Sequence, residues 1–164
     1  MIGAKLGHFL DKPLSPILKR IRIHPNIFTL TGFMITAIAA VVIPYNIKLG
    51  GLLILAGGLF DMLDGISARV NNKITKFGAF LDSLLDRYSD AFLFLSTAWY
   101  LASKGEHTAA FLSLGTLIGA FLISYARARA EGLGEECKTG IMERPERIIL
   151  LICAALTGWF IPVL

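Results

Sequence analysis

Five stretches of almost continuous hydrophobic side chains, separated by short polar segments, dominate the sequence. They cover residues 27–45, 49–67, 77–103, 108–126 and 147–164, and the fourth can continue as a helix to residue 131. A helix needs about 20 apolar residues to cross the hydrocarbon core of a bilayer. The pattern therefore predicts an all-α fold, an integral membrane helical bundle with five visible spans. Gly50, Gly51, Gly57 and Gly58 predict close packing of the second span against its neighbours.

Residues 1–25 carry a different pattern, in which apolar and basic side chains alternate and Pro13 and Pro16 interrupt the middle. Such a composition is typical of an amphipathic helix that lies on the membrane surface. We therefore divide the chain into a juxtamembrane amphipathic segment, residues 1–25, and a transmembrane domain, residues 26–164. A surface anchor without chemistry is the simplest interpretation of the first segment.

Composition and charge agree with a membrane protein. The 164 residues are 55% hydrophobic, and 16 Lys and Arg against 12 Asp and Glu give a net charge of +4. In a membrane protein such an excess reflects basic cytoplasmic loops and anionic headgroups, so no nucleic-acid partner is expected. Five Lys or Arg lie in residues 1–25, three in 69–76 and five in 127–147, whereas the intervening loops hold only Lys48 and Lys104. This alternation predicts a multi-pass protein of the cell membrane with a cytoplasmic N-terminus.

Four carboxylates lie inside or at the mouth of the second and third spans, at Asp61, Asp64, Asp82 and Asp86. Ionisable groups at membrane depth are costly and are functional candidates. The first two are three residues apart and the last two are four apart, so each pair lies on one helix face. A polar break at residues 71–72 allows the two helices to turn back on each other. The four carboxylates are then expected to converge, open to the cytoplasm.

Converging like charges cannot all ionise unless a cation lies between them. The sequence therefore predicts one or two hard divalent cations, Mg²⁺ or Mn²⁺, bound by oxygen ligands. Small residues at Gly65, Ala68 and Gly78 and the cation Arg69 suit a diphosphate substrate beside the metal. The alternatives are structural carboxylates or a cation pathway. Asp90, one turn beyond Asp86, is as compatible with pairing to Arg87 or another polar group as with binding metal.

The spacing resembles a known enzyme signature. Asp61-x2-Asp64-Gly65-x2-Ala68-Arg69-x8-Gly78-x3-Asp82-x3-Asp86 is similar, without a gap or substitution, to that of the CDP-alcohol phosphotransferases. The resemblance implies a membrane enzyme that transfers a phosphatidyl-type group from a CDP-linked lipid to an alcohol and releases CMP. It implies that all four aspartates bind two divalent ions and that Asp86 is also the general base. Members of the family usually have six spans, one more than the five visible here. The resemblance also implies that the protein forms a homodimer.

The same resemblance places Gly65, Ala68, Arg69 and Gly78 along the CDP pocket. The family often has Pro-Asn-x-x-Thr at the start of its first span, which corresponds here to Pro25, Asn26 and Thr29. Asn26 and Thr29 are therefore expected near the nucleotide. Helix capping is the alternative for both, because Asn and Thr at a helix start satisfy free backbone donors.

The acceptor alcohol is predicted from arginines outside the signature. Arg127, Arg129, Arg144 and Arg147 reach the level of the metal site if the last two spans pack beside the second and third. Arginine presents a planar fork that suits phosphate oxygens, which favours an acceptor that carries a phosphate. The alternative is positive charge on cytoplasmic loops together with Glu–Arg pairs.

A second resemblance concerns the identity of that acceptor. R-A-R-A-E at 127–131 and E-R-P-E-R at 143–147 resemble the phosphatidylinositol-phosphate and archaetidylinositol-phosphate synthases. The resemblance implies inositol 1-phosphate as acceptor, CDP-diacylglycerol or an archaeal CDP-ether lipid as donor, and a helping role for Lys138. Glycerol 3-phosphate, as in phosphatidylglycerophosphate synthases, or another alcohol is the alternative. The remote alternative is that the protein is a non-catalytic, cation-binding membrane protein.

Overall fold

The computed structural model describes residues 24–135 and 144–157 and contains five helices there. They are α2 (Pro25–Val42), α3 (Ile47–Val70), α4 (Lys76–Ser103), α5 (His107–Gly132) and α6 (Arg144–Thr157). The all-α prediction is confirmed, and each helix coincides with one predicted hydrophobic stretch. The predicted surface helix falls almost wholly before residue 24 and so lies outside the described residues, as does Lys138.

Side chains at the helix ends explain where the chain turns. Asn46 and Thr75 cap α3 and α4 by accepting hydrogen bonds from Leu49 N at 3.1 Å and Gly78 N at 2.9 Å. The predicted break after α3 is confirmed. Asn72 adopts a left-handed conformation with φ of 51°, and Lys73 N donates to Ala68 O at 2.9 Å, as in a helix C-terminal motif.

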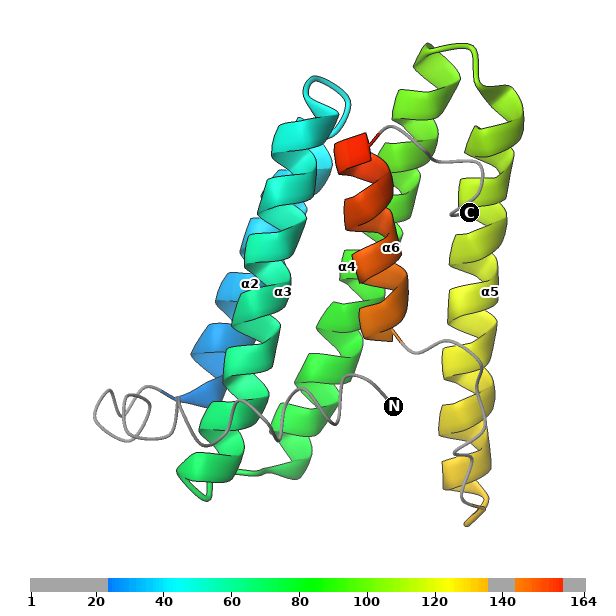
Figure 1. Cartoon of the computed structure of the whole chain (residues 1–164). Coiled ribbons are helices and arrows are strands. Elements are labelled where there is room, and N and C mark those ends of the chain that lie inside the picture. Colours follow the sequence, from blue (N-terminus) through cyan, green and yellow to red (C-terminus); the bar gives the residue numbers. More distant parts are fainter. Residues whose placement is uncertain (1–23, 136–143, 158–164) are drawn as a thin grey trace.

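The helices run alternately up and down (Figure 1). Helix α2 packs against α3 and α4, α5 packs against α4, and α6 packs against α3. The beginnings of α2 and α4 and the ends of α3 and α5 lie at the same end of the molecule, the lower end in Figure 1. This end, hereafter the site end, carries the predicted chemistry.

The core brings together apolar side chains from all five described helices. Ile54, Leu93 and Leu151 are each at most 2% exposed and belong to one cluster. Hydroxyl groups add bonds between helices, since Ser113 Oγ on α5 donates to Phe94 O on α4 at 2.9 Å. Such bonds and close packing hold helices together where lipid offers no hydrophobic driving force.

Close helix packing occurs at three of the four glycines predicted for it. A Cβ on Gly57 would lie 2.5 Å from Thr36 Oγ1 of α2, and one on Gly51 would lie 3.1 Å from Ala155 Cβ of α6. A Cβ on Gly50 would lie 2.5 Å from Ile43 Cγ1, at the end of α2. The prediction is wrong for Gly58, where a Cβ would meet no atom within 4 Å.

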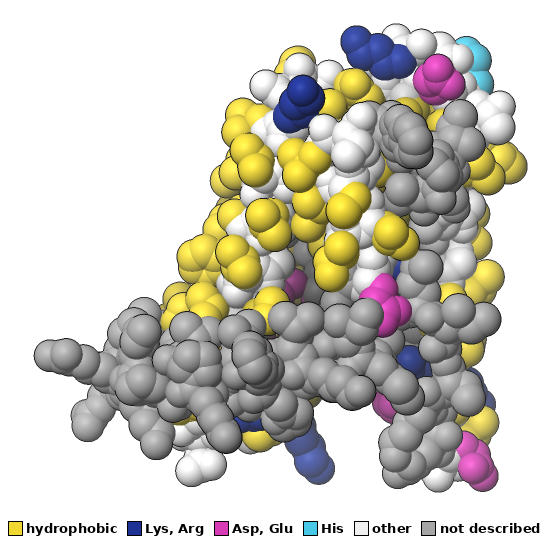
Figure 2. All heavy atoms as spheres, viewed as in Figure 1, with side chains coloured by type: hydrophobic (Ala, Val, Ile, Leu, Met, Phe, Trp, Pro, Cys, Tyr) yellow, Lys and Arg dark blue, Asp and Glu magenta, His cyan; other side chains and the backbone are white. Residues whose placement is uncertain are grey.

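Three of the helices, α2, α3 and α5, are long and apolar enough to cross a membrane. Helix α4 has 28 residues, but several charged side chains in its first half keep it out of this group. Helix α6 is too short for it, with 14 described residues. Large apolar side chains such as Val41, Phe111 and Ile118 are more than half exposed. Hydrophobic side chains cover much of the face above the grey atoms in Figure 2, whereas most charged side chains lie toward the upper and lower ends. Such a surface suits lipid rather than water.

Candidate active site

A cavity of about 300 Å³ opens at the site end. It is bounded by the start of α2, the end of α3, the following turn and the start of α4. Its walls are Pro25, Asn26, Thr29, Asp64, Gly65, Ala68, Arg69, Lys73, Ile74, Thr75, Gly78, Ala79 and Asp82. All six residues predicted to contact CDP, and two of the four predicted metal carboxylates, therefore line one cavity. We call it the nucleotide cavity.

The carboxylates are distributed around this cavity. Asp64 is 7% exposed and interacts electrostatically with Asp82 and Asp61, which are half-buried. Asp86 follows Asp82 by one turn of α4, and its Oδ2 lies 4.0 Å from Arg87 Nη2. In residues 24–135 and 144–157, no three acidic, His or Cys side chains form a closed set of metal ligands. Asp64 and Asp82 therefore line the cavity, whereas Asp61 and Asp86 are not among its walls. The predicted convergence of all four carboxylates into one set of metal ligands is not seen among the described residues.

These residues suit a divalent cation. Asp64 Oδ2 is buried and has no hydrogen-bond partner within the described structure. A buried carboxylate oxygen in that position is costly unless it is paired. Carboxylate oxygens are also the ligands that Mg²⁺ and Mn²⁺ prefer. The donor set therefore fits the predicted metal.

Glycine keeps the nucleotide cavity open. A Cβ on Gly78 would lie 3.0 Å from Thr75 Oγ1 and 3.2 Å from Asn26 Oδ1. A Cβ on Gly65 would lie 3.4 Å from Arg69 Nη1. Any larger residue at Gly78 would fill the space between α2 and α4 into which a ligand could enter. Close backbone approach is a common reason for glycine at a binding site.

The start of α2 is capped by His24 rather than by Asn26 or Thr29. The Nδ1 of His24 accepts a hydrogen bond from Asn26 N at 3.3 Å. The Thr29 hydroxyl donates to Pro25 O at 3.3 Å, within its own helix. Both side chains line the nucleotide cavity instead.

Gly32 is a residue of the site that the sequence analysis missed. A Cβ on Gly32 would lie 2.7 Å from Asp61 Oδ1 and 3.1 Å from Gly57 O. The glycine therefore lets the Asp61 carboxylate lie against the α2 backbone. The signal was available, because Thr29, Gly32 and Thr36 form a buried stripe of small residues along one face of α2.

Gly32→Ala is expected to weaken Mn²⁺ binding by about 10-fold or more, because the added methyl group displaces Asp61. Residues that orient metal ligands typically contribute ~10–100-fold to affinity. The measurement is a Mn²⁺ titration of the purified protein followed by electron paramagnetic resonance. Gly58→Ala is the matched control, since its methyl group meets no atom. Equal Mn²⁺ affinity in the two variants would contradict this role.

A second cavity of about 660 Å³ lies between α4 and α5 and reaches the first turn of α6. Its walls are Phe80, Ser83, Leu84, Arg87, Phe121, Ile123, Ser124, Tyr125, Arg127, Ala128, Glu131 and Arg147. Two predicted acceptor residues, Arg127 and Arg147, line this acceptor cavity, but Arg129 does not. The side chain of Arg144 lies outside the described residues.

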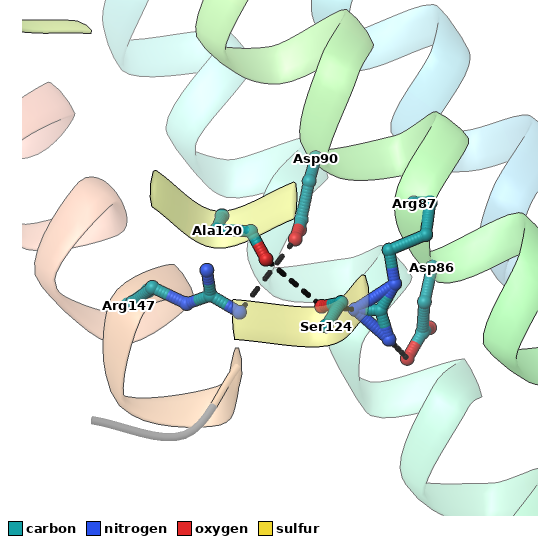
Figure 3. Close-up of polar contacts among 6 residues, drawn as sticks. All are labelled: Asp86, Arg87, Asp90, Ala120, Ser124 and Arg147. Carbon is teal, nitrogen blue, oxygen red and sulfur yellow. Dashed lines mark hydrogen bonds and ion pairs between the residues drawn. The ribbon is translucent and has the colours of Figure 1, made fainter. Parts of the chain in front are cut away.

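Three polar contacts at the acceptor cavity were not predicted from the sequence (Figure 3). Arg87 Nη1 donates to Ser124 Oγ at 2.7 Å, and the Ser124 hydroxyl donates to Ala120 O at 2.9 Å. Arg147 Nη2 lies 3.8 Å from Asp90 Oδ2. Asp90 therefore pairs with Arg147 across helices. No sequence spacing signals the contacts of Arg87 with Ser124 and of Asp90 with Arg147, because each joins two different helices.

A family model described as CDP-alcohol phosphatidyltransferase matches residues 22–162. The chain belongs to this family. The predicted family is confirmed, and this CDP-alcohol phosphatidyltransferase is an enzyme, as the signature of aspartates and glycines implies.

The named curated relatives of this CDP-alcohol phosphatidyltransferase include two enzymes of different organisms. The archaetidylinositol phosphate synthase of Methanothermobacter thermautotrophicus is 40% identical over 149 residues, which cover 90% of this chain and 74% of the relative. The phosphatidylinositol phosphate synthase of Corynebacterium glutamicum is 35% identical over 166 residues, which cover 98% and 75%.

Solved structures agree with this CDP-alcohol phosphatidyltransferase fold. The phosphatidylinositol phosphate synthase of Mycobacterium tuberculosis with CDP-DAG bound superimposes with a TM-score of 0.80 at 33% identity, over 93% of this chain and 78% of that one. A structure of the same enzyme with manganese and citrate gives a TM-score of 0.77 at 33% identity, over 93% and 75%. The membrane-enzyme fold is therefore confirmed.

Proposed function

We propose that this protein transfers a phosphatidyl or archaetidyl group from a CDP-linked lipid to inositol 1-phosphate and releases CMP. One observation carries the proposal: α4 contributes to the walls of both the nucleotide cavity and an arginine-lined acceptor cavity. Asp82 lines the first, Arg87 lines the second, and Asp86 lies between them in sequence. Relatives named for inositol phosphate products and the CDP-DAG bound to the tuberculosis enzyme support it.

The nucleotide cavity would hold the CDP end of the lipid. Asn26, Thr29, Gly65, Ala68, Arg69 and Gly78 contact the nucleotide in this proposal. Asp61, Asp64, Asp82 and Asp86 would hold two ions of Mg²⁺ or Mn²⁺. When bound, these ions neutralise the diphosphate oxygens and stabilise the phosphate of the departing CMP. The manganese in the tuberculosis enzyme supports a divalent ion at this site.

The acceptor cavity would orient the attacking alcohol. Arg127 and Arg147 hold the phosphate of the acceptor, with Arg129, Lys138 and Arg144 as further candidates. Asp86 takes the proton from a ring hydroxyl, whose oxygen bonds to the β-phosphorus of the CDP-lipid. The bond from this phosphorus to the bridging oxygen breaks, and CMP leaves with that oxygen. General-base assistance typically contributes about 10²–10⁴-fold.

The membrane arrangement of this proposal follows the distribution of basic residues. The chain crosses the cell membrane several times, with its N-terminus and both cavities on the cytoplasmic side. Residues 26–164 form the transmembrane domain and residues 1–25 an amphipathic surface helix. Family resemblance favours a homodimer.

A panel of acceptors tests the proposed function. The purified protein is incubated with CDP-diacylglycerol, Mg²⁺ and one alcohol at a time, and CMP release is measured. Inositol 1-phosphate is expected to give the highest kcat/KM, followed by glycerol 3-phosphate, with free inositol and serine far behind. A preference for an unphosphorylated alcohol would refute the acceptor assignment, because it would leave the arginines without an anion.

Arg127→Gln is expected to raise the apparent KM for inositol 1-phosphate by about 10–100-fold. Removing one partner of a charged hydrogen bond costs about 1.5–3 kcal/mol, and uniform binding energy appears in KM. Lys104→Gln is the control, since it removes the same charge at the C-cap of α4, away from the acceptor cavity. If both variants raised KM equally, charge rather than contact would explain the effect.

A further inference from the structure

Asp90 is a buried acid on α4 that lies outside the aspartate signature and does not line the nucleotide cavity. Its side chain is 2% exposed and follows Asp86 by one helical turn. A charge buried to this degree is costly unless a partner of opposite charge lies beside it. Arg147, in the first turn of α6, provides that charge with its Nη2 at 3.8 Å and its side chain 11% exposed (Figure 3).

Arg147 lies in the wall of the acceptor cavity. Its helix packs against α3, whereas Asp90 belongs to α4, the helix that carries Asp82 and Asp86. The ion pair therefore connects the wall of the acceptor cavity with the catalytic helix. A guanidinium has five N–H donors, so an ion pair through one nitrogen does not exhaust its capacity to bind an anion.

We propose that Asp90 is a positioning residue for the acceptor, whose carboxylate fixes the Arg147 guanidinium in the wall of the acceptor cavity. This inference rests on the proposed function. A guanidinium that is held in place before the ligand binds loses less conformational freedom on binding, and this preorganisation increases the affinity for the ligand. Asp90 acts through Arg147 and touches no substrate itself.

A double-mutant cycle separates this role from that of a purely structural ion pair. Wild type, Asp90→Asn, Arg147→Gln and the double variant are assayed with CDP-diacylglycerol, and KM for inositol 1-phosphate, KM for the lipid and kcat are measured. Asp90→Asn is expected to raise the acceptor KM about 10-fold and to leave the lipid KM unchanged. Because Asp90 acts through Arg147, the double variant is expected to match Arg147→Gln, a strong non-additivity.

Thr97→Val is the control for loss of a buried polar group from α4, since Thr97 is 0% exposed and its Oγ1 has no hydrogen-bond partner in the described structure. It is expected to leave the acceptor KM unchanged. If Asp90→Asn does not fold, Asp90→Glu retains the charge and shifts the guanidinium, and it too is expected to raise the acceptor KM alone.

Two results would overturn the positioning role. One is an acceptor KM of wild-type value in folded Asp90→Asn or Asp90→Glu. The other is a double variant whose KM increase is the product of the two single increases. A wild type that transfers to no phosphorylated alcohol would instead refute the proposed function itself, so the two failures are distinguishable.

Discussion

Replacing Asp86 by asparagine is expected to lower kcat by about 10²–10⁴-fold, the usual contribution of a general base. The amide keeps the shape of the side chain but cannot take the proton of the attacking hydroxyl. Asp86 is half-buried on α4, beside Arg87 and one turn from Asp82. The measurement is CMP release in a single turnover with both substrates saturating.

Binding of the CDP-lipid must remain measurable in Asp86→Asn, because the nucleotide cavity keeps all its walls. Ser103→Ala, at the opposite end of α4, is the control for loss of activity during purification in detergent. A comparable melting temperature in the two variants shows that the fold is retained. Wild-type turnover in folded Asp86→Asn would show that another group takes the proton.

Asp64→Asn is expected to have the largest effect on metal binding. Asp64 is the most buried of the four carboxylates and lines the nucleotide cavity. Residues that only orient metal ligands typically contribute ~10–100-fold to affinity, so loss of a direct ligand is expected to weaken Mn²⁺ binding by more than ~100-fold. Electron paramagnetic resonance measures the binding, and CMP release at millimolar Mg²⁺ should be lost with it.

The same substitution is expected to raise the melting temperature in metal-free buffer, because it removes a buried negative charge close to Asp61 and Asp82. Asp90→Asn is the matched control for metal binding, since it also neutralises a buried acid near the site. Its Mn²⁺ affinity should equal that of wild type. An unchanged affinity in Asp64→Asn would remove Asp64 from the ligand set.

Much of the fold could be predicted from the sequence because the required length of a membrane helix leaves a clear pattern. Each apolar stretch became one helix, and the asparagines after residue 70 produced the predicted reversal. The rotation of each helix about its axis was less predictable. Gly57 faces α2 and its neighbour Gly58 faces outward, a difference that composition does not reveal.

The candidate site was also predictable only in part. The signature from Asp61 to Asp86 predicted residues that share the nucleotide cavity, but only Asp64 and Asp82 of its four aspartates line that cavity. Positions i, i+3 and i+4 share a helix face, yet the spacing does not determine which cavity that face lines. The contacts of Gly32 with Asp61, Arg87 with Ser124 and Asp90 with Arg147 join different helices. Only the packing of those helices determines which side chains meet.

The most direct test of the central claim is a crystal structure of this protein with Mn²⁺ and CDP, recorded with anomalous scattering from manganese. We predict manganese peaks in the nucleotide cavity, bound by Asp64 and Asp82 and in contact with the diphosphate. A diphosphate bound there without manganese, or manganese bound elsewhere on the protein, would contradict the claim that these carboxylates hold the catalytic ions.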